Sequence, residues 1–170
     1  MEELVSLNRI KAQVEASNWQ DAIRKAGELL VKNDDIENAY IQNMIDSIKE
    51  LGPYIVLTKG FALAHSAPSE VVKKTSISLI NLKNSVDFGS NNDPVKVIMC
   101  LACVDKISHI DLLQKIASRL MQEGIIDRLS SCQTEDEIYS IINNAWKEKG
   151  NEWTKDSMCL LIWLWIIFNA

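Results

Sequence analysis

Apolar and polar residues alternate along the chain in two periods, which predict helices and strands in turn. A spacing of three to four residues runs through 19–33 and again through 37–51, which indicates two amphipathic helices. Ser17 or Asn18 is placed to cap the first of these helices. A loose alternation over residues 8–15 predicts a short strand before it.

Short apolar runs in the middle of the chain predict most of the sheet. Residues 54–57 and 61–64 are two such runs, separated by a turn that contains Gly60. Residues 75–83 alternate between apolar and polar as a strand does. Residues 95–104 are almost entirely apolar, which is typical of a central strand covered on both faces.

Helical spacing returns after the last of these strands. Residues 108–122 are predicted to form a helix that begins with a capping box made by Ser108 and Asp111. A short helix is expected over 124–131 and a longer one over 134–148. Because helices and strands interleave, we expect an α+β fold arranged as an α/β/α sandwich, with a mixed β-sheet of four to five strands covered by helices on both faces.

The predicted single domain spans about residues 4–148, and residues 149–170 form an apolar C-terminal tail of unknown role. Within the tail, residues 158–168 are eleven apolar residues without interruption, whereas a membrane-spanning helix needs about twenty. A last core or dimer-packing segment, a truncated membrane span and a chain end altered by a frameshift all remain open. The tail therefore leaves a homodimer open without predicting one.

Composition narrows the class of protein. The 170 residues are 47% hydrophobic and 24% charged, as in a soluble globular protein. A net charge of −5 argues against a nucleic-acid partner, because phosphate binding requires clustered Lys and Arg. Residues 1–15 are charged from the start and contain no apolar signal-peptide core, so the expected location is the cytoplasm.

Cys100 and Cys103 form a CxxC pair, a spacing that occurs in redox and metal sites. The pair lies in a predicted strand, where residues three apart point to opposite faces, and no second pair completes a zinc site. The remaining cysteines are Cys132 and Cys159. We interpret the CxxC pair as buried structural thiols and predict neither a metal site nor a cofactor.

The chain has two histidines, and each follows a predicted strand. His65 comes directly after residues 61–64, and His109 lies at the start of the helix predicted over 108–122. Free backbone N–H groups at a helix start favour an anion such as a phosphoryl group. A neutral imidazole is a competent nucleophile near neutral pH, so one histidine can accept a phosphoryl group while the other hydrogen-bonds it. A structural role is the alternative, since lone histidines beside apolar residues are most often structural.

Other reaction chemistries fit the sequence less well. It contains no GxSxG nucleophile elbow, no GxxxxGK[ST] or GxGxxG phosphate loop and no metal-ligand cluster. A cysteine–histidine enzyme would need Cys100 or Cys103, and both are expected to be buried. A phosphoryl relay between histidines needs neither a metal nor a nucleotide loop.

Four segments of the chain resemble a known family. They are GPYIVLTKGFALAH at 52–65, VVKKTSISLINLKNSVDF at 71–88, NDPVKVIMCLACVDKISHID at 92–111 and WQDA at 19–22. Together they are similar to the enzyme IIA domain of the mannitol/fructose-type (type 2) sugar phosphotransferase system (PTS), and most similar to its ascorbate-specific branch. The resemblance covers about residues 4–146.

The resemblance implies a cytoplasmic phosphocarrier in which a mixed sheet lies between helices. His65 matches the family's phosphorylated histidine and is expected to become a tele-phosphohistidine, while His109 matches the second active-site histidine, which stabilises the phosphoryl group. The implied donor is the carrier protein HPr, the implied acceptor is a cysteine of enzyme IIB, and enzyme IIC takes part indirectly. No cofactor is implied, and L-ascorbate is one candidate among the sugars that the sequence leaves open.

The chain departs from the family pattern near the first histidine. Ala64 and Ala67 stand where the family usually has a proline and an arginine, and Lys59 replaces a proline in the preceding turn. Lys59 is a candidate for the missing positive charge, and the efficiency of transfer stays open. Glu70 matches an acidic position in the same loop, with a solvated surface carboxylate as its expected role.

Two other functions remain as alternatives to the phosphocarrier. One is a phosphorylation-responsive regulatory binding module, because related domains also act in transcriptional and nitrogen regulators. The other is a degenerate paralogue, which Ala64, Ala67 and the tail would suggest. No attached DNA-binding domain is recognisable in the sequence, so a role in transport is the favoured hypothesis.

Overall fold

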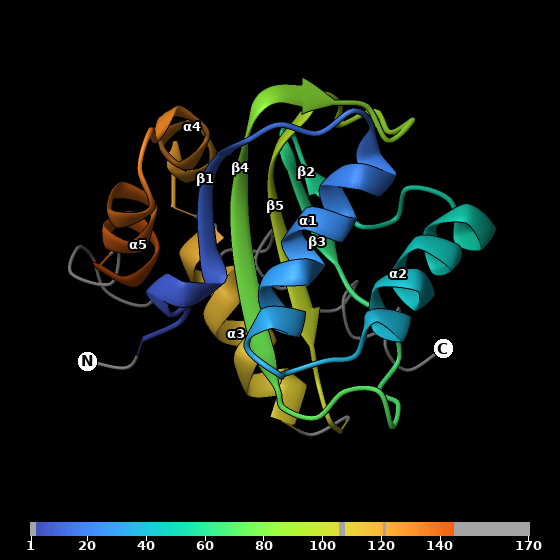
Figure 1. Ribbon diagram of the computed structural model, residues 1–170. Helices are drawn as coiled ribbons and strands as arrows, with labels where there is room; N and C mark the ends of the chain where they lie inside the picture. The colour runs from blue at the N-terminus through green and yellow to red at the C-terminus, as the bar shows by residue number, and fades with distance from the viewer. Residues whose placement is uncertain (1–2, 106–107, 121, 145–170) are drawn as a thin grey trace.

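A computed structural model describes residues 3–105, 108–120 and 122–144 of the chain, apart from the side chains of Ser108, His109 and Asp111. In this part of the chain five strands form one sheet (Figure 1). The strands are β1 (Ile10–Val14), β2 (Val56–Thr58), β3 (Phe61–Ala64), β4 (Ser76–Val86) and β5 (Val95–Ala102).

The sheet is mixed, with the strand order β1-β4-β5-β3-β2. β1 runs parallel to β4 and β3 runs parallel to β5, whereas β4 with β5 and β2 with β3 are antiparallel. β5 is the central strand, and all of its residues except Lys96 are buried. This burial explains why its sequence is an almost continuous apolar run.

Helices cover both faces of the sheet, so the expected α/β/α sandwich is confirmed. Figure 1 shows α1 and α2 on one face and α3 on the other, with α4 and α5 beside it. A 3-10 turn at Leu7–Arg9 precedes β1. The helices are α1 (Trp19–Lys32), α2 (Asn38–Leu51), α3 (Ser108–Leu120), α4 (Ile125–Ser131) and α5 (Glu135–Asn144).

Each strand contributes to two hydrophobic cores, because successive residues of a strand point to opposite faces. In β3, Ala62 and Ala64 join the core beneath α1 and α2. Phe61 and Leu63 join the core beneath α3, α4 and α5. A strand as short as β3 is therefore held from both sides, which gives the residue after it a fixed starting point.

Particular side chains set the start of α1 and its distance from α2. The Asn18 side chain accepts a hydrogen bond of 2.9 Å from the backbone N–H of Asp21, which settles the choice between Ser17 and Asn18 as the cap. Further along, Gly27 faces α2 so closely that a Cβ there would lie 2.6 Å from Cγ1 of Ile41. A larger residue at position 27 would push the two helices apart.

Most predicted boundaries agree closely with the structure, and two differ for local reasons. β2 begins at Val56 because the chain at Tyr54 is folded into a turn, in which Tyr54 N–H donates to Gly52 O. β4 is longer than predicted because Val86 still pairs with Val95 across the hairpin to β5.

Some sequence predictions concern residues outside the described part of the chain. These are the capping box of Ser108 and Asp111, the end of the last helix beyond residue 144, and the tail at 149–170. Among the residues that are described, no helix is long and apolar enough to cross a membrane.

A buried ion pair joins the N-terminal segment to the loop after α1. Arg9 donates from Nε and Nη2 to the two carboxylate oxygens of Asp35, at 2.6 and 2.9 Å. The Asp35 side chain is only 1% exposed, so the guanidinium compensates a buried charge. The backbone carbonyl of Asp35 in turn accepts hydrogen bonds from the N–H groups of Lys73 and Lys74. Arg9 thus supports, through Asp35, the segment that precedes β4.

Replacing Arg9 with alanine is expected to destabilise the fold strongly. The substitution leaves the Asp35 carboxylate buried without its partner, which should lower the free energy of unfolding by about 3 kcal/mol. Urea unfolding followed by circular dichroism measures the loss. The control is Lys83→Ala, which breaks an exposed ion pair with Glu15 and should leave the unfolding midpoint unchanged. Equal midpoints for the two variants would contradict this role of Arg9.

Candidate active site

Two neighbouring parallel strands end at the same edge of the sheet. β3 and β5 pair up to Ala64 with Cys100, so their carboxyl ends lie side by side. His65 follows β3 directly, and a short segment leads from β5 to the start of α3. His109 is the second residue of α3, and its side chain lies outside the described residues. The sheet thus directs both histidine-bearing segments to one edge.

The imidazole of His65 is buried, with only 2% of the residue exposed. Its Nδ1 lies 2.8 Å from the backbone carbonyl oxygen of Leu63. A carbonyl oxygen can only accept, so Nδ1 carries the hydrogen in this contact, and the lone pair of the neutral ring is left on Nε2. The local fold thereby selects the tautomer in which the hydrogen is on Nδ1 and the lone pair is on Nε2.

The ring of Tyr54 packs against the imidazole of His65. Their centroids are 5.4 Å apart and the ring planes are 82° apart, the edge-to-face arrangement that aromatic rings favour. Burial raises the pKa of the Tyr54 hydroxyl, so this group stays neutral. Tyr54 belongs to the turn that precedes β2, and from this turn its ring reaches the imidazole of His65.

The hydroxyl of Tyr40 holds the peptide that follows His65. It accepts a hydrogen bond of 3.0 Å from the N–H of Ser66, and it lies 3.0 Å from the carbonyl oxygens of both Ser66 and Leu101. Tyr40 is 0% exposed, and this burial raises the pKa of its hydroxyl. The hydroxyl therefore stays protonated, and its one hydrogen can be donated to the carbonyl of Ser66 or to that of Leu101.

The chain leaves β3 as an irregular segment, residues 66–74, that is anchored near its far end. There Val72 forms an isolated bridge with Ile36. Between His65 and this anchor, Ala67 and Glu70 are exposed to solvent. The exposure of Glu70 agrees with the surface carboxylate expected from the sequence.

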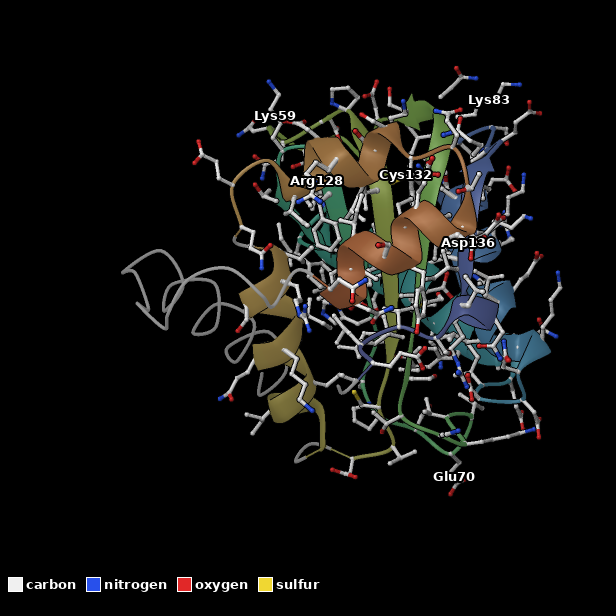
Figure 2. All side chains as sticks on the ribbon, turned by 90° about the vertical axis from the view of Figure 1, so that its left-hand side faces the viewer. Lys59, Glu70, Lys83, Arg128, Cys132 and Asp136 are labelled. Carbon is white, nitrogen blue, oxygen red and sulfur yellow. The ribbon has the colours of Figure 1, made fainter. Side chains whose placement is uncertain are left out.

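Lys59 lies at the opposite end of β3 from His65. It belongs to the turn before the strand, where Gly60 has a positive φ of 80° that glycine adopts readily. Figure 2 shows Lys59 and Glu70 at opposite ends of the molecule. Gly60 and the four residues of β3 separate Lys59 from His65, and a strand of four residues alone spans about 13 Å. The expectation that Lys59 supplies positive charge near His65 is therefore wrong.

Cys100 and Cys103 point to opposite faces of the sheet, as their spacing in a strand predicted. Cys100 belongs to the core beneath α1 and α2, and Cys103 to the core on the other face. Burial raises the pKa of each thiol to about 12, with the charge of Asp105 adding to the effect at Cys103. Among the described residues, no cluster of three or more His, Cys, Asp or Glu could hold a metal ion.

The two tyrosines at this site were missed by the sequence analysis. Tyr40 lies within the helix predicted over residues 37–51, and Tyr54 is the first residue of the strand predicted over residues 54–57. The sequence does carry one signal for Tyr40, which is a tyrosine among buried apolar positions. A buried hydroxyl requires a hydrogen-bond partner. The sequence does not reveal which partner, since Ser66 and Leu101 are distant from Tyr40 along the chain.

Comparison with known families decides the class of protein. Residues 3–145 match the family described as "Phosphoenolpyruvate-dependent sugar phosphotransferase system, EIIA 2". The chain belongs to this EIIA family. It is therefore a phosphotransferase that relays phosphoryl groups in sugar uptake, and the resemblance inferred from the sequence is confirmed.

This EIIA chain is similar to ascorbate-specific PTS system EIIA components of enteric bacteria. It is 36% identical over 144 residues to the component from Salmonella choleraesuis, a match that covers 84% of this chain and 94% of the relative. It is 37% identical over 138 residues to the component from Escherichia coli K12, covering 80% of this chain and 90% of the relative.

Solved EIIA structures share the fold. The mannitol-specific cryptic enzyme IIA from E. coli matches with a TM-score of 0.77 and 31% identity, covering 84% of this chain and 99% of that one. The E. coli mannitol IIA, solved in a complex with phosphorylated mannitol IIB, matches with a TM-score of 0.70 and 26% identity, covering 81% and 96%. The mixed sheet between helices is thus shared with EIIA proteins of known structure.

The hydrogen bond to Leu63 predicts the tautomer of the neutral His65 ring. At about pH 8.5, where an ordinary imidazole is neutral, we expect a protonated Nδ1 and an unprotonated Nε2. A multiple-bond ¹H–¹⁵N correlation spectrum distinguishes the two nitrogens, and the His65→Gln variant identifies the peaks by their loss. A ring protonated on Nε2 would contradict the contact with Leu63.

The burial of Cys100 and Cys103 predicts slow alkylation. With a pKa of about 12, about one thiol in ten thousand is ionised at about pH 8, against roughly a quarter of ordinary cysteines. Iodoacetamide labelling with peptide mapping should leave both thiols unmodified in the folded chain and modify them in urea. Rapid labelling of either thiol in the folded chain would rule out this burial.

Proposed function

We propose that His65 is the residue of this EIIA chain that becomes phosphorylated, with the carrier protein HPr as donor and a cysteine of a cognate enzyme IIB as acceptor. One observation carries the proposal: the 2.8 Å contact between Nδ1 and the Leu63 carbonyl, which leaves the lone pair on Nε2. Attack through Nε2 gives a tele-phosphohistidine. Enzyme IIC takes part indirectly, through IIB.

Each transfer exchanges one bond to phosphorus for another. In the first, the Nε2 lone pair of His65 forms a bond to phosphorus while the bond to the HPr imidazole breaks and returns its electron pair to that ring. In the second, a thiolate of IIB forms the new bond and the Nε2–phosphorus bond breaks. Nδ1 keeps its hydrogen throughout, so the Leu63 carbonyl stabilises the positive charge that builds on the ring.

We assign His109 to the stabilisation of the phosphoryl group. It is the second residue of α3, and α3 begins at the sheet edge where His65 follows β3. The first N–H groups of a helix have no partner within the helix and favour an anion. An imidazole N–H at this place would add a hydrogen bond to a phosphoryl oxygen as its charge develops. These donors offset the absence of an arginine at Ala67.

Access to the nucleophile requires a local movement. With His65 only 2% exposed, the donor reaches Nε2 after side chains that cover it are displaced. The segment after Ser66 is suited to move, because it is irregular and Ala67 is exposed. A movement there leaves the bond between Nδ1 and Leu63 intact, since Leu63 belongs to β3.

We infer that the transported sugar is L-ascorbate and that the chain works in the cytoplasm. The support is similarity to ascorbate-specific EIIA components over 94% and 90% of their lengths. In these systems the membrane subunit selects the sugar, so the similarity bears on which IIB and IIC the chain serves. Ascorbate-dependent phosphate flow through the chain, with the matching IIB and IIC, tests this assignment.

Removing His65 is expected to abolish phosphorylation, and removing His109 to slow it. With phosphorylated HPr as donor, the wild type should gain one acid-labile phosphate, measured by intact mass. His65→Ala should gain none. His109→Ala should gain one at a rate lower by about 100-fold, the usual contribution of one donor to a transition state.

His65→Gln is the control for this experiment, because it keeps a polar side chain in the buried site and removes the nucleophile. Circular dichroism should show it folded, and intact mass should show it unphosphorylated. Phosphate on His65→Ala would place the acceptor elsewhere. A folded wild type that accepts no phosphate would contradict the proposal and favour a regulatory binding module instead.

A further inference from the structure

α2 carries one buried hydroxyl in an otherwise apolar stripe. Tyr40 is 0% exposed, in the first turn of the helix. A hydroxyl in a core is costly unless it is hydrogen-bonded, so its partners indicate what it contributes. The other buried residues of the stripe carry neither N–H nor O–H groups on their side chains, and they are Ile41, Met44, Ile45 and Ile48.

The hydroxyl lies where the backbone ladder between β3 and β5 ends. The last pair of that ladder is Ala64 with Cys100. Just beyond it, the Tyr40 oxygen accepts from the N–H of Ser66 and reaches the carbonyl oxygen of Leu101, each at 3.0 Å. One oxygen atom therefore links the residue after His65 to the strand that leads to α3.

We propose that Tyr40 is a positioning residue for phosphoryl transfer, whose hydroxyl fixes the Ser66 peptide and so the direction of Nε2. The inference rests on the proposed role of His65 as acceptor. The imidazole is contacted by Leu63 and Tyr54, and the backbone of His65 continues directly into the Ser66 peptide that Tyr40 holds. In phosphoryl transfer the attacking nitrogen must lie in line with the bond that breaks. A misplacement of the reacting atom by about 1 Å can lower the rate by about 100-fold.

Tyr40→Phe tests the proposal, because it removes the hydroxyl and keeps the buried ring. Single-turnover phosphorylation by phosphorylated HPr, followed by rapid quench, gives the rate at saturating donor and the donor concentration at half-saturation. We expect the saturating rate to fall by about tenfold. The half-saturating concentration should change by less than about twofold, because Tyr40 is buried and cannot touch HPr.

Ser78→Ala is the matched control. Ser78 on β4 is also 0% exposed, and its hydroxyl donates a 2.7 Å hydrogen bond to the carbonyl of Ala26. This variant also loses a buried hydroxyl–carbonyl bond, but Ser78 lies two strands across the sheet from the His65 segment, since Ser78 pairs with Cys100 and Cys100 with Ala64. It should be destabilised like Tyr40→Phe and yet transfer at the wild-type rate. Equal rates in wild type and Tyr40→Phe, or equal losses in the two variants, would overturn the positioning role.

Two nuclear magnetic resonance measurements test the position of His65 without a transfer reaction. In Tyr40→Phe the ring resonances of His65 should shift or broaden, whereas in Ser78→Ala they should superimpose on those of the wild type. Unchanged His65 resonances in folded Tyr40→Phe would overturn the inference. If this variant does not fold, hydrogen exchange of the backbone amides in the wild type provides the test. The N–H of Ser66 should be protected from exchange by its hydrogen bond to Tyr40. Exchange of this N–H at the rate of an unfolded chain would refute that hydrogen bond.

The outcomes also separate this inference from the proposed function. No phosphate on the folded wild type would refute the role of His65 as acceptor in this relay, and with it the catalytic effect of Tyr40. Phosphate on His65 of the wild type, together with an unaffected Tyr40→Phe, would leave the proposed function standing and remove only the positioning role.

Discussion

The parallel pairing of β3 with β5 is the constraint on which the active site depends. Parallel strands end at the same edge of a sheet, so this register places His65 beside the strand that leads to His109. The helices on both faces bury these strands and fix their ends. The buried pair of Arg9 and Asp35 then holds the segment that leaves this edge, through backbone bonds to Lys73 and Lys74.

A backbone carbonyl and a neighbouring aromatic ring orient the imidazole of His65. The carbonyl of Leu63 fixes the hydrogen on Nδ1, and the ring of Tyr54 packs edge-to-face with the imidazole. An oriented imidazole suits the proposed relay, in which the ring must both accept a phosphoryl group and release it. In this account, stabilisation of the phosphoryl charge falls to the start of α3 and to His109.

The sequence predicted the elements well because their hydrophobic periods are strong. It also indicated His65 and His109, since each follows a strand, and the family resemblance implied roles for them that stay predictions. The sequence could not reveal contacts between distant segments. Tyr40 looks like one more apolar residue of α2 until the fold brings Ser66 and Leu101 to its hydroxyl. Lys59 looks close to His65 along the chain, yet an extended strand carries the two to opposite ends.

In the proposed relay, the phosphoryl group is carried on one particular nitrogen, Nε2 of His65. The most direct test is ³¹P–¹⁵N correlation on the ¹⁵N-labelled chain after phosphorylation by HPr. We expect a single phosphorus coupled to Nε2 of His65, with Nδ1 still protonated and hydrogen-bonded to the Leu63 carbonyl. Coupling of phosphorus to Nδ1 of His65, or to a nitrogen of His109, would contradict this proposal.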